Sequence, residues 1–158
     1  MSIITHSGYG YSKILCESVA SWFVNEFFPR HKLTIDIVHR GLKREEVRGY
    51  CDVVGDGQRP RHFLIELDTY MDKELYVKTL FHELTHMAQW IRGSLRHRYG
   101  KLCYCKTPVE NWEYWYMPHE IEAREEEERL YIWYLTDKQG WTVNQVAQGS
   151  FSNRLCAL

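Results

Sequence analysis

The first long pattern of apolar and polar positions along the chain is helical. Its apolar side chains recur every three or four residues: Leu15, Val19, Trp22, Phe23 and Phe27. Ser12 stands where the first turn needs a cap for its free backbone N–H groups, and Pro29 stands where a helix must stop. We therefore expect a helix between Ser12 and Pro29 that buries one face in the core.

The following positions alternate between apolar and polar, which is the period of a half-buried strand. Leu33, Ile35 and Ile37 alternate with polar residues in this way. Residues 47–54 are a second strand candidate, and a third, residues 63–67, follows a segment rich in turn-forming residues. The pattern predicts a small sheet of three or four strands.

Two more helices are expected in the second half of the chain. Thr69, with an acid three residues on, has the form of a capping box for a helix that ends at Gly93. Pro118 suits the first turn of another helix, which continues to about Tyr134. Residues 93–117 show no regular pattern, and residues 141–158 give only a weak signal for a short helix.

Length and composition favour a single α+β domain that covers residues 1–158. The chain has 158 residues, of which 44% are hydrophobic, so it can build one core and is too short for two ordinary domains. Its formal net charge of -1 argues against a partner held by overall charge, such as nucleic acid. The chain lacks an apolar run of membrane-span length and the pattern of an export signal, so we expect a cytoplasmic protein.

Five cysteines are scattered along the chain and cannot all pair with one another, which favours a reducing compartment. Cys103 and Cys105 are separated by one residue, whereas structural zinc sites usually place two to four residues between such ligands. We interpret them as ordinary cysteines rather than as a second metal site.

The sequence His-Glu-Leu-Thr-His at positions 82–86 predicts a catalytic metal site. His82 and His86 lie one helical turn apart, so both can present a ring nitrogen to one Zn²⁺ ion. Glu83 can then act as general base toward a water held by the metal. The alternative is a pair of surface histidines on an amphipathic helix. Apolar neighbours on both sides of the motif favour a helix with one buried side and argue for the metal site.

A catalytic zinc usually takes a third protein ligand, and the helix that starts at Pro118 supplies two candidates. Glu120 and Glu122 are two residues apart, so they point about 200° apart around a helix and cannot both face the metal. We favour Glu122, because Glu126 follows it by one turn and could orient a ligand histidine. Glu120 is then a residue that stabilises the helix start, and His119 is a further alternative ligand.

Peptide hydrolysis also requires a donor to the developing oxyanion. Tyr116 is the first choice for this catalytic role, with Tyr114, His97 and His119 as alternatives and simple aromatic packing as the competing explanation. The segment from Arg92 to Lys106 is basic and contains tyrosines, so it could bind an acidic substrate or a nucleic-acid strand. A solvated loop is the interpretation we favour, since the rest of the chain is slightly acidic.

Two quoted segments, HELTHMAQW and the later YMPHEIEA, resemble the gluzincin branch of zinc peptidases. They are most similar to the small SprT-like proteins, or minigluzincins, that tailed phages encode. The positions of the second segment that match this pattern are Tyr116, Pro118, Glu120, Glu122 and Ala123. This chain has Glu126 where the thermolysin-like pattern has an aspartate, and it lacks the third histidine and the zinc ribbon of SprT proteins.

The resemblance implies a zincin-like domain with an N-terminal helix, a small sheet, the HExxH helix and a ligand helix. It implies that the last strand of the sheet borders the substrate groove. The implied function is a zinc metallopeptidase that cleaves a protein or peptide substrate, in the host cytoplasm if the protein is phage-encoded. A zinc hydrolase of a non-peptide amide and a non-catalytic zinc-containing binding module are the alternatives.

Overall fold

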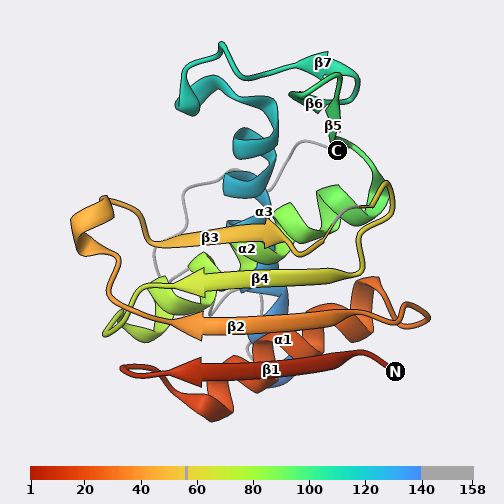
Figure 1. Ribbon diagram of the computed structural model, residues 1–158. Coiled ribbons are helices and arrows are strands. Elements are labelled where there is room, and N and C mark those ends of the chain that lie inside the picture. The colour runs from red at the N-terminus through yellow and green to blue at the C-terminus, as the bar shows by residue number, and fades with distance from the viewer. Residues whose placement is uncertain (56, 140–158) are drawn as a thin grey trace.

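A mixed sheet backed by helices forms the body of the protein. The structure, a computed structural model, describes residues 1–55 and 57–139 (Figure 1). The main sheet has four strands: β1 (Ile3–Gly8), β2 (Thr34–His39), β3 (Gly49–Val53) and β4 (His62–Leu67). Their order is β1-β2-β4-β3, with β1, β2 and β4 parallel and β3 antiparallel to β4. The α+β class is confirmed, while the weak helix expected at residues 141–158 lies outside the described residues.

Three α-helices and two short 3-10 helices accompany the sheet in the part of the chain that the structure describes. The helices are α1 (Lys13–Phe27), η1 (Lys43–Glu45), α2 (Lys73–Arg92), η2 (Tyr114–Tyr116) and α3 (Pro118–Gln139). Figure 1 shows α1 and α2 behind the sheet, with α3 crossing α2. The expected helices are therefore present, although α3 extends beyond the expected end.

The caps of α1 and α2 follow local chemistry. The Ser12 side chain accepts a hydrogen bond from the N–H of Leu15, as expected. The N-cap of α2 is Asp72 rather than the predicted Thr69, because the Asp72 carboxylate accepts the N–H of Leu75 at 3.0 Å. Gly93 ends α2 as predicted, with a left-handed φ of 81°.

The core between the sheet and the helices holds α2 in place. Its members with no exposed surface include the following residues: Ile35, Ile37, Phe63, Ile65, Leu80, Phe81, Leu84 and Met87. Trp22 of α1 contacts Phe81 of α2 and Tyr134 of α3 edge-on, with ring centroids 5.6 and 5.5 Å apart. One side of α2 is therefore fixed on the sheet, and its remaining side faces α3.

The order of the strands corrects an expectation about the substrate groove. The resemblance implied that the last strand of the sheet borders the groove, but β4 lies between β2 and β3. The free edge next to α2 belongs to β3, since β3 pairs only with β4 among the described residues. The first strand, β1, was not predicted, because it is half exposed and its apolar positions are few.

The segment expected to be irregular contains a second sheet. Its strands are β5 (Leu95–Arg98), β6 (Lys101–Tyr104) and β7 (Thr107–Pro108). A tight turn at Tyr99 and Gly100 joins β5 to β6, with positive φ at both residues. Across residues 1–55 and 57–139, the helices are all too short or too polar to span a bilayer.

Candidate metal centre

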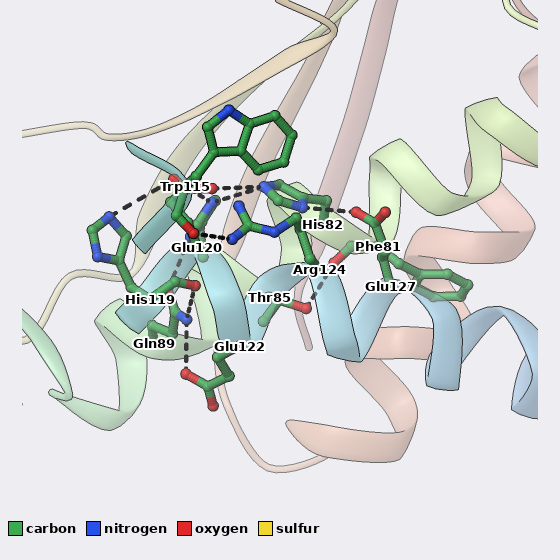
Figure 2. A network of polar contacts seen from close by, with 11 residues as sticks. Phe81, His82, Thr85, Gln89, Trp115, His119, Glu120, Glu122, Arg124 and Glu127 are labelled. Atoms are coloured by element: carbon green, nitrogen blue, oxygen red, sulfur yellow. Dashed lines mark hydrogen bonds and ion pairs between the residues drawn. The ribbon is translucent and has the colours of Figure 1, made fainter. Parts of the chain in front are cut away.

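The crossing of α2 and α3 brings three metal-binding side chains together. His82 and His86 come from α2 and Glu120 from the first turn of α3, and one ligand atom of each lies within 4.8 Å of the others. The Nε2 atoms of the histidines are 3.2 Å apart, and they lie 3.2 and 3.3 Å from the Glu120 carboxylate oxygens. Figure 2 shows Glu120 pointing at His82 from the facing helix. We call these three residues the metal cradle.

The distances in the metal cradle match the requirements of zinc. Tetrahedral zinc with bonds of about 2.0–2.1 Å holds its ligand atoms about 3.3 Å apart. The distance between the two Nε2 atoms agrees with that edge length. Each Nε2 also lies at about this distance from one Glu120 oxygen, Oε2 for His82 and Oε1 for His86. Two histidines and one glutamate are also a ligand set that catalytic zinc sites use, with a fourth position left for water. The residues present therefore fit a zinc ion.

Hydrogen bonds on the outer side of each ring determine which nitrogen faces the cradle. His82 Nδ1 lies 2.7 Å from a Glu127 carboxylate oxygen, and His86 Nδ1 lies 2.9 Å from Gln89 Oε1. Both acceptors require a proton on Nδ1, which leaves a lone pair on each Nε2. The two Nε2 atoms are 3.2 Å apart, and their lone pairs repel each other because neither nitrogen has a proton to donate. A cation between these atoms and Glu120 would remove that repulsion.

The carboxylates around the cradle favour positive charge within it. Burial lowers the pKa of His82, but the hydrogen bonds to Glu120 and Glu127 outweigh burial and raise this pKa to about 10. Burial raises the pKa of Glu120, yet its bonds to the two histidines dominate and bring the pKa well below its ordinary value. The same field that favours a proton on these rings stabilises a metal cation in its place.

Glu83 lies beside the cradle in a buried position. Its exposed fraction is 5%, and burial raises its pKa to about 7 against the opposing effect of His86 and His82. Gly49, at the start of β3, makes room for it, because a Cβ atom at that position would lie 2.7 Å from Glu83 Oε1. The edge strand therefore passes directly over the carboxylate that the sequence marks as general base.

Glu122 is not part of the metal cradle, which corrects the ligand predicted from sequence. Its Oε2 accepts a hydrogen bond from Gln89 Nε2 at 2.8 Å (Figure 2). The same oxygen accepts a hydrogen bond from the Tyr104 hydroxyl at 2.7 Å. Glu122 is two positions after Glu120, which corresponds to a rotation of about 200° around the helix, so only one of the two can face His82 and His86. Glu122 instead holds Gln89, which in turn bonds His86.

The outer carboxylate is also different from the one expected. Glu126 pairs with Arg129 on the same helix, and Glu127 bonds His82. Glu127 is seven positions after Glu120, which is about two turns, so both lie on the same face of α3. Glu126 is six positions after Glu120 and points about 120° away from that face. Glu127 therefore shares the face of Glu120, and the sequence argument placed the supporting acid relative to the wrong ligand.

Tyr116, the residue predicted as oxyanion donor, lies in η2 with an exposed side chain. The Tyr116 side chain is 64% exposed, and no polar contact of it is recorded in the described part of the chain. Tyr114, also in η2, has a raised pKa, which is caused by burial, by the charge of Glu120 and by a hydrogen bond with that carboxylate. Tyr114 was among the alternatives for the oxyanion donor, and Tyr116 was the first choice.

Two features hold η2 over the cradle. Arg124, one turn after Glu120, donates from Nη2 to the Trp115 carbonyl oxygen at 2.5 Å. Its guanidinium also lies 4.9 Å from the centre of the Trp115 ring, which Figure 2 shows above His82 and Arg124. These contacts hold the segment that carries Tyr114. No motif in the sequence marked Arg124 as a residue of this region.

His119 and His97 occupy different surroundings. His119 is 5% exposed, its Nε2 is 3.7 Å from Glu120, and its Nδ1 has no hydrogen-bond partner among the described residues. It lies next to the cradle without joining the group of three ligand atoms. His97 is exposed on β5, where its ring lies against Trp90 at 5.4 Å.

Comparisons of the chain with protein-family models, curated proteins and solved structures found no match. The function proposed below is supported by the residues of the metal cradle, their hydrogen bonds and their distances.

Proposed function

We propose that this protein is a zinc-dependent metallopeptidase. His82, His86 and Glu120 would hold the zinc, and Glu83 would act as general base. The observation that carries the proposal is the metal cradle itself: two ring nitrogens and a carboxylate at tetrahedral spacing, with a buried glutamate next to the first histidine.

The residues around the cradle have separate tasks in peptide hydrolysis. Zinc, when bound, supplies a Lewis acid that polarises the scissile carbonyl and makes water more acidic. Glu83 accepts a proton from the attacking water and delivers it to the leaving amine. The Tyr114 hydroxyl donates a hydrogen bond to the carbonyl oxygen as that oxygen gains negative charge.

The free edge of β3 supports a peptide as the substrate. Backbone groups on this edge have no strand partner among the described residues, so an extended peptide can pair with them. The Gly49 end of β3 lies against Glu83, so a peptide held there passes the general base. Backbone pairing requires several successive peptide groups, which a small amide does not have.

Metal analysis and one conservative substitution test the proposal. We expect purified protein to contain about one zinc per chain. Glu83→Gln should retain that zinc and lower kcat for a cleaved peptide by about 10²–10⁴, because it removes only the base. Glu26→Gln, an exposed position on α1, is the matched control and should behave as wild type. A metal-free protein, or Glu83→Gln with unchanged hydrolysis, would refute the proposal.

A further inference from the structure

The second sheet carries a group of cations next to the metal cradle. Five lysine and arginine residues lie between positions 92 and 109, a stretch that has no aspartate or glutamate: Arg92, Arg96, Arg98, Lys101 and Lys106. Four of these residues, at positions 92, 98, 101 and 106, are exposed. We call β5, β6 and these five residues the cationic hairpin.

None of the five cations of the cationic hairpin forms an ion pair within the described residues, whereas Arg40, Lys78 and Arg129 each pair with glutamate. One carboxylate lies against the hairpin, because Glu110 accepts the N–H of Leu102 on β6 at 2.8 Å. Arg98 also stands directly opposite Lys101 across the two strands. Like charges in this arrangement repel each other and destabilise a strand pair, so a bound anion would be favoured beside them.

A chain of hydrogen bonds joins the hairpin to the cradle. The Tyr104 hydroxyl of β6 bonds Glu122, Glu122 accepts from Gln89, and Gln89 bonds His86. Figure 1 shows the second sheet and η2 on the same side of the main sheet, beyond its β3 edge. A peptide lying along β3 therefore has the cationic hairpin near its path.

We infer that the cationic hairpin binds acidic side chains of the peptide substrate, to one side of the bond that is cleaved. This inference rests on the proposed function and adds a substrate class to it. Between the hairpin and α3 lie four exposed aromatic residues, which offer apolar contact to the substrate closer to the cleaved bond: Trp112, Tyr114, Trp115 and Tyr116.

The distribution of charge favours a peptide over a nucleic-acid strand. The cationic strands have four residues each and extend about 13 Å. Beyond them, the cradle presents the carboxylates of Glu83, Glu120 and Glu127. A nucleic acid carries a phosphate at every position and would place charge against these groups. A peptide carries carboxylates only where its sequence has them.

Two pairs of fluorogenic peptides test the inference. The members of a pair differ only in a short run of Glu or Gln, which lies before the cleaved bond in one pair and after it in the other. We expect the Glu peptide to have a KM about fivefold to tenfold lower in one of the two placements, and this advantage to shrink as salt rises. Arg98→Gln/Lys101→Gln should remove most of the difference by raising KM for the Glu peptide. Lys13→Gln/Lys73→Gln removes the same charge from exposed positions at the starts of α1 and α2 and should preserve the difference. Lys73 lies about 30 Å from the other end of α2, which leads into the hairpin.

Binding measurements separate this inference from the proposed function. With Glu83→Gln protein, fluorescence anisotropy should show tighter binding of the Glu peptide than of the Gln peptide, whether or not the wild type cleaves either. Equal binding of the two peptides in both placements would overturn the inference, even in an active zinc peptidase. Tighter binding of a single-stranded oligothymidylate through Arg98 and Lys101 would also overturn it and assign the hairpin to nucleic acid.

Discussion

The protein buries histidine rings in two places, and the hydrogen bonds of those rings differ. His39 of β2 is 1% exposed, and its Nδ1 donates to the Ser7 carbonyl oxygen at 2.9 Å. Its Nε2 accepts from the Tyr76 hydroxyl at 2.9 Å, and its ring stacks on Tyr11 with centroids 3.4 Å apart. Both nitrogens of His39 therefore have a partner within the fold, and the ring needs nothing further.

His82 and His86 have only half of that arrangement. Each Nδ1 has an acceptor, as in His39, but the two Nε2 atoms face each other and the carboxylate of Glu120. The comparison teaches that burial alone does not mark a functional histidine. The state of the second nitrogen distinguishes a ring that completes a core from a ring that is arranged for a cation.

Removal of the proposed third ligand, Glu120, should have the largest effect, because it changes what the Nε2 atoms of His82 and His86 face. Glu120→Ala takes away one of three ligand atoms, so its zinc affinity should fall by more than the roughly 10–100-fold typical of outer partners. Glu122→Ala, two residues away, should keep zinc near the wild-type level. Zinc content after dialysis, measured by mass spectrometry, checks both. Loss of zinc in Glu122→Ala alone would contradict the assignment of Glu120.

Removal of one hydroxyl tests the oxyanion donor. Tyr114→Phe should lower kcat by about 10²–10³, because it removes a donor aimed at the developing negative charge, and zinc content should not change. Tyr116→Phe is the matched control, since that side chain is exposed and should have no such role. Steady-state kinetics on one peptide measure both variants. A larger loss in Tyr116→Phe would restore the residue first predicted from sequence.

Loss of the outer carboxylate should convert one cradle histidine into a less strongly oriented ligand. Glu127→Gln weakens the acceptor of the His82 Nδ1 proton, so zinc affinity should fall by about 10–100-fold. Glu126→Gln is the control, because Glu126 pairs with Arg129 instead. Competition with a chelating dye reports the affinities. Equal affinities for the two variants would show that the bond to His82 has no influence on the metal.

His39→Gln tests the other side of the comparison and should affect stability alone. It disrupts the bonds to Tyr76 and Ser7, so the free energy of unfolding should fall by about 1–3 kcal/mol. Zinc affinity should remain that of the wild type. Chemical denaturation and dye competition measure the two quantities. A loss of zinc without a loss of stability would show that His39 is also part of the metal site.

The same variant should change the pH dependence of stability. Burial lowers the pKa of His39 below its ordinary 6.5, against an opposing bond to Ser7, so the unfolded chain binds this proton first as the solution is acidified. The contribution of His39 is present above pH 6.5 and decreases as pH falls toward the folded-state pKa. The slope of the unfolding free energy against pH, as pH falls below 6.5, should be shallower in His39→Gln.

The sequence by itself determined the parts of the site that lie within one element. His82 and His86 face the same way because four residues make one helical turn, and this holds wherever the helix packs. The caps at Ser12 and Gly93 are equally local, since each serves backbone groups within the next or preceding turn. The alternation at residues 33–37 similarly predicted a strand, though neither its partners nor its direction.

Only the tertiary structure decided what the histidines meet. The rotation of α3 about its axis selects Glu120 over Glu122, and it depends on packing against α2. Buried Ala123 and Leu130 lie three and ten residues after Glu120, and Glu127 lies between them on the same stripe. That stripe is visible in the sequence, but the sequence does not say which residues it contacts. Its partner is α2, whose residue His86 precedes Glu120 by 34 positions. The β3 edge and the cationic hairpin likewise depend on contacts between distant segments, which local periodicity does not encode.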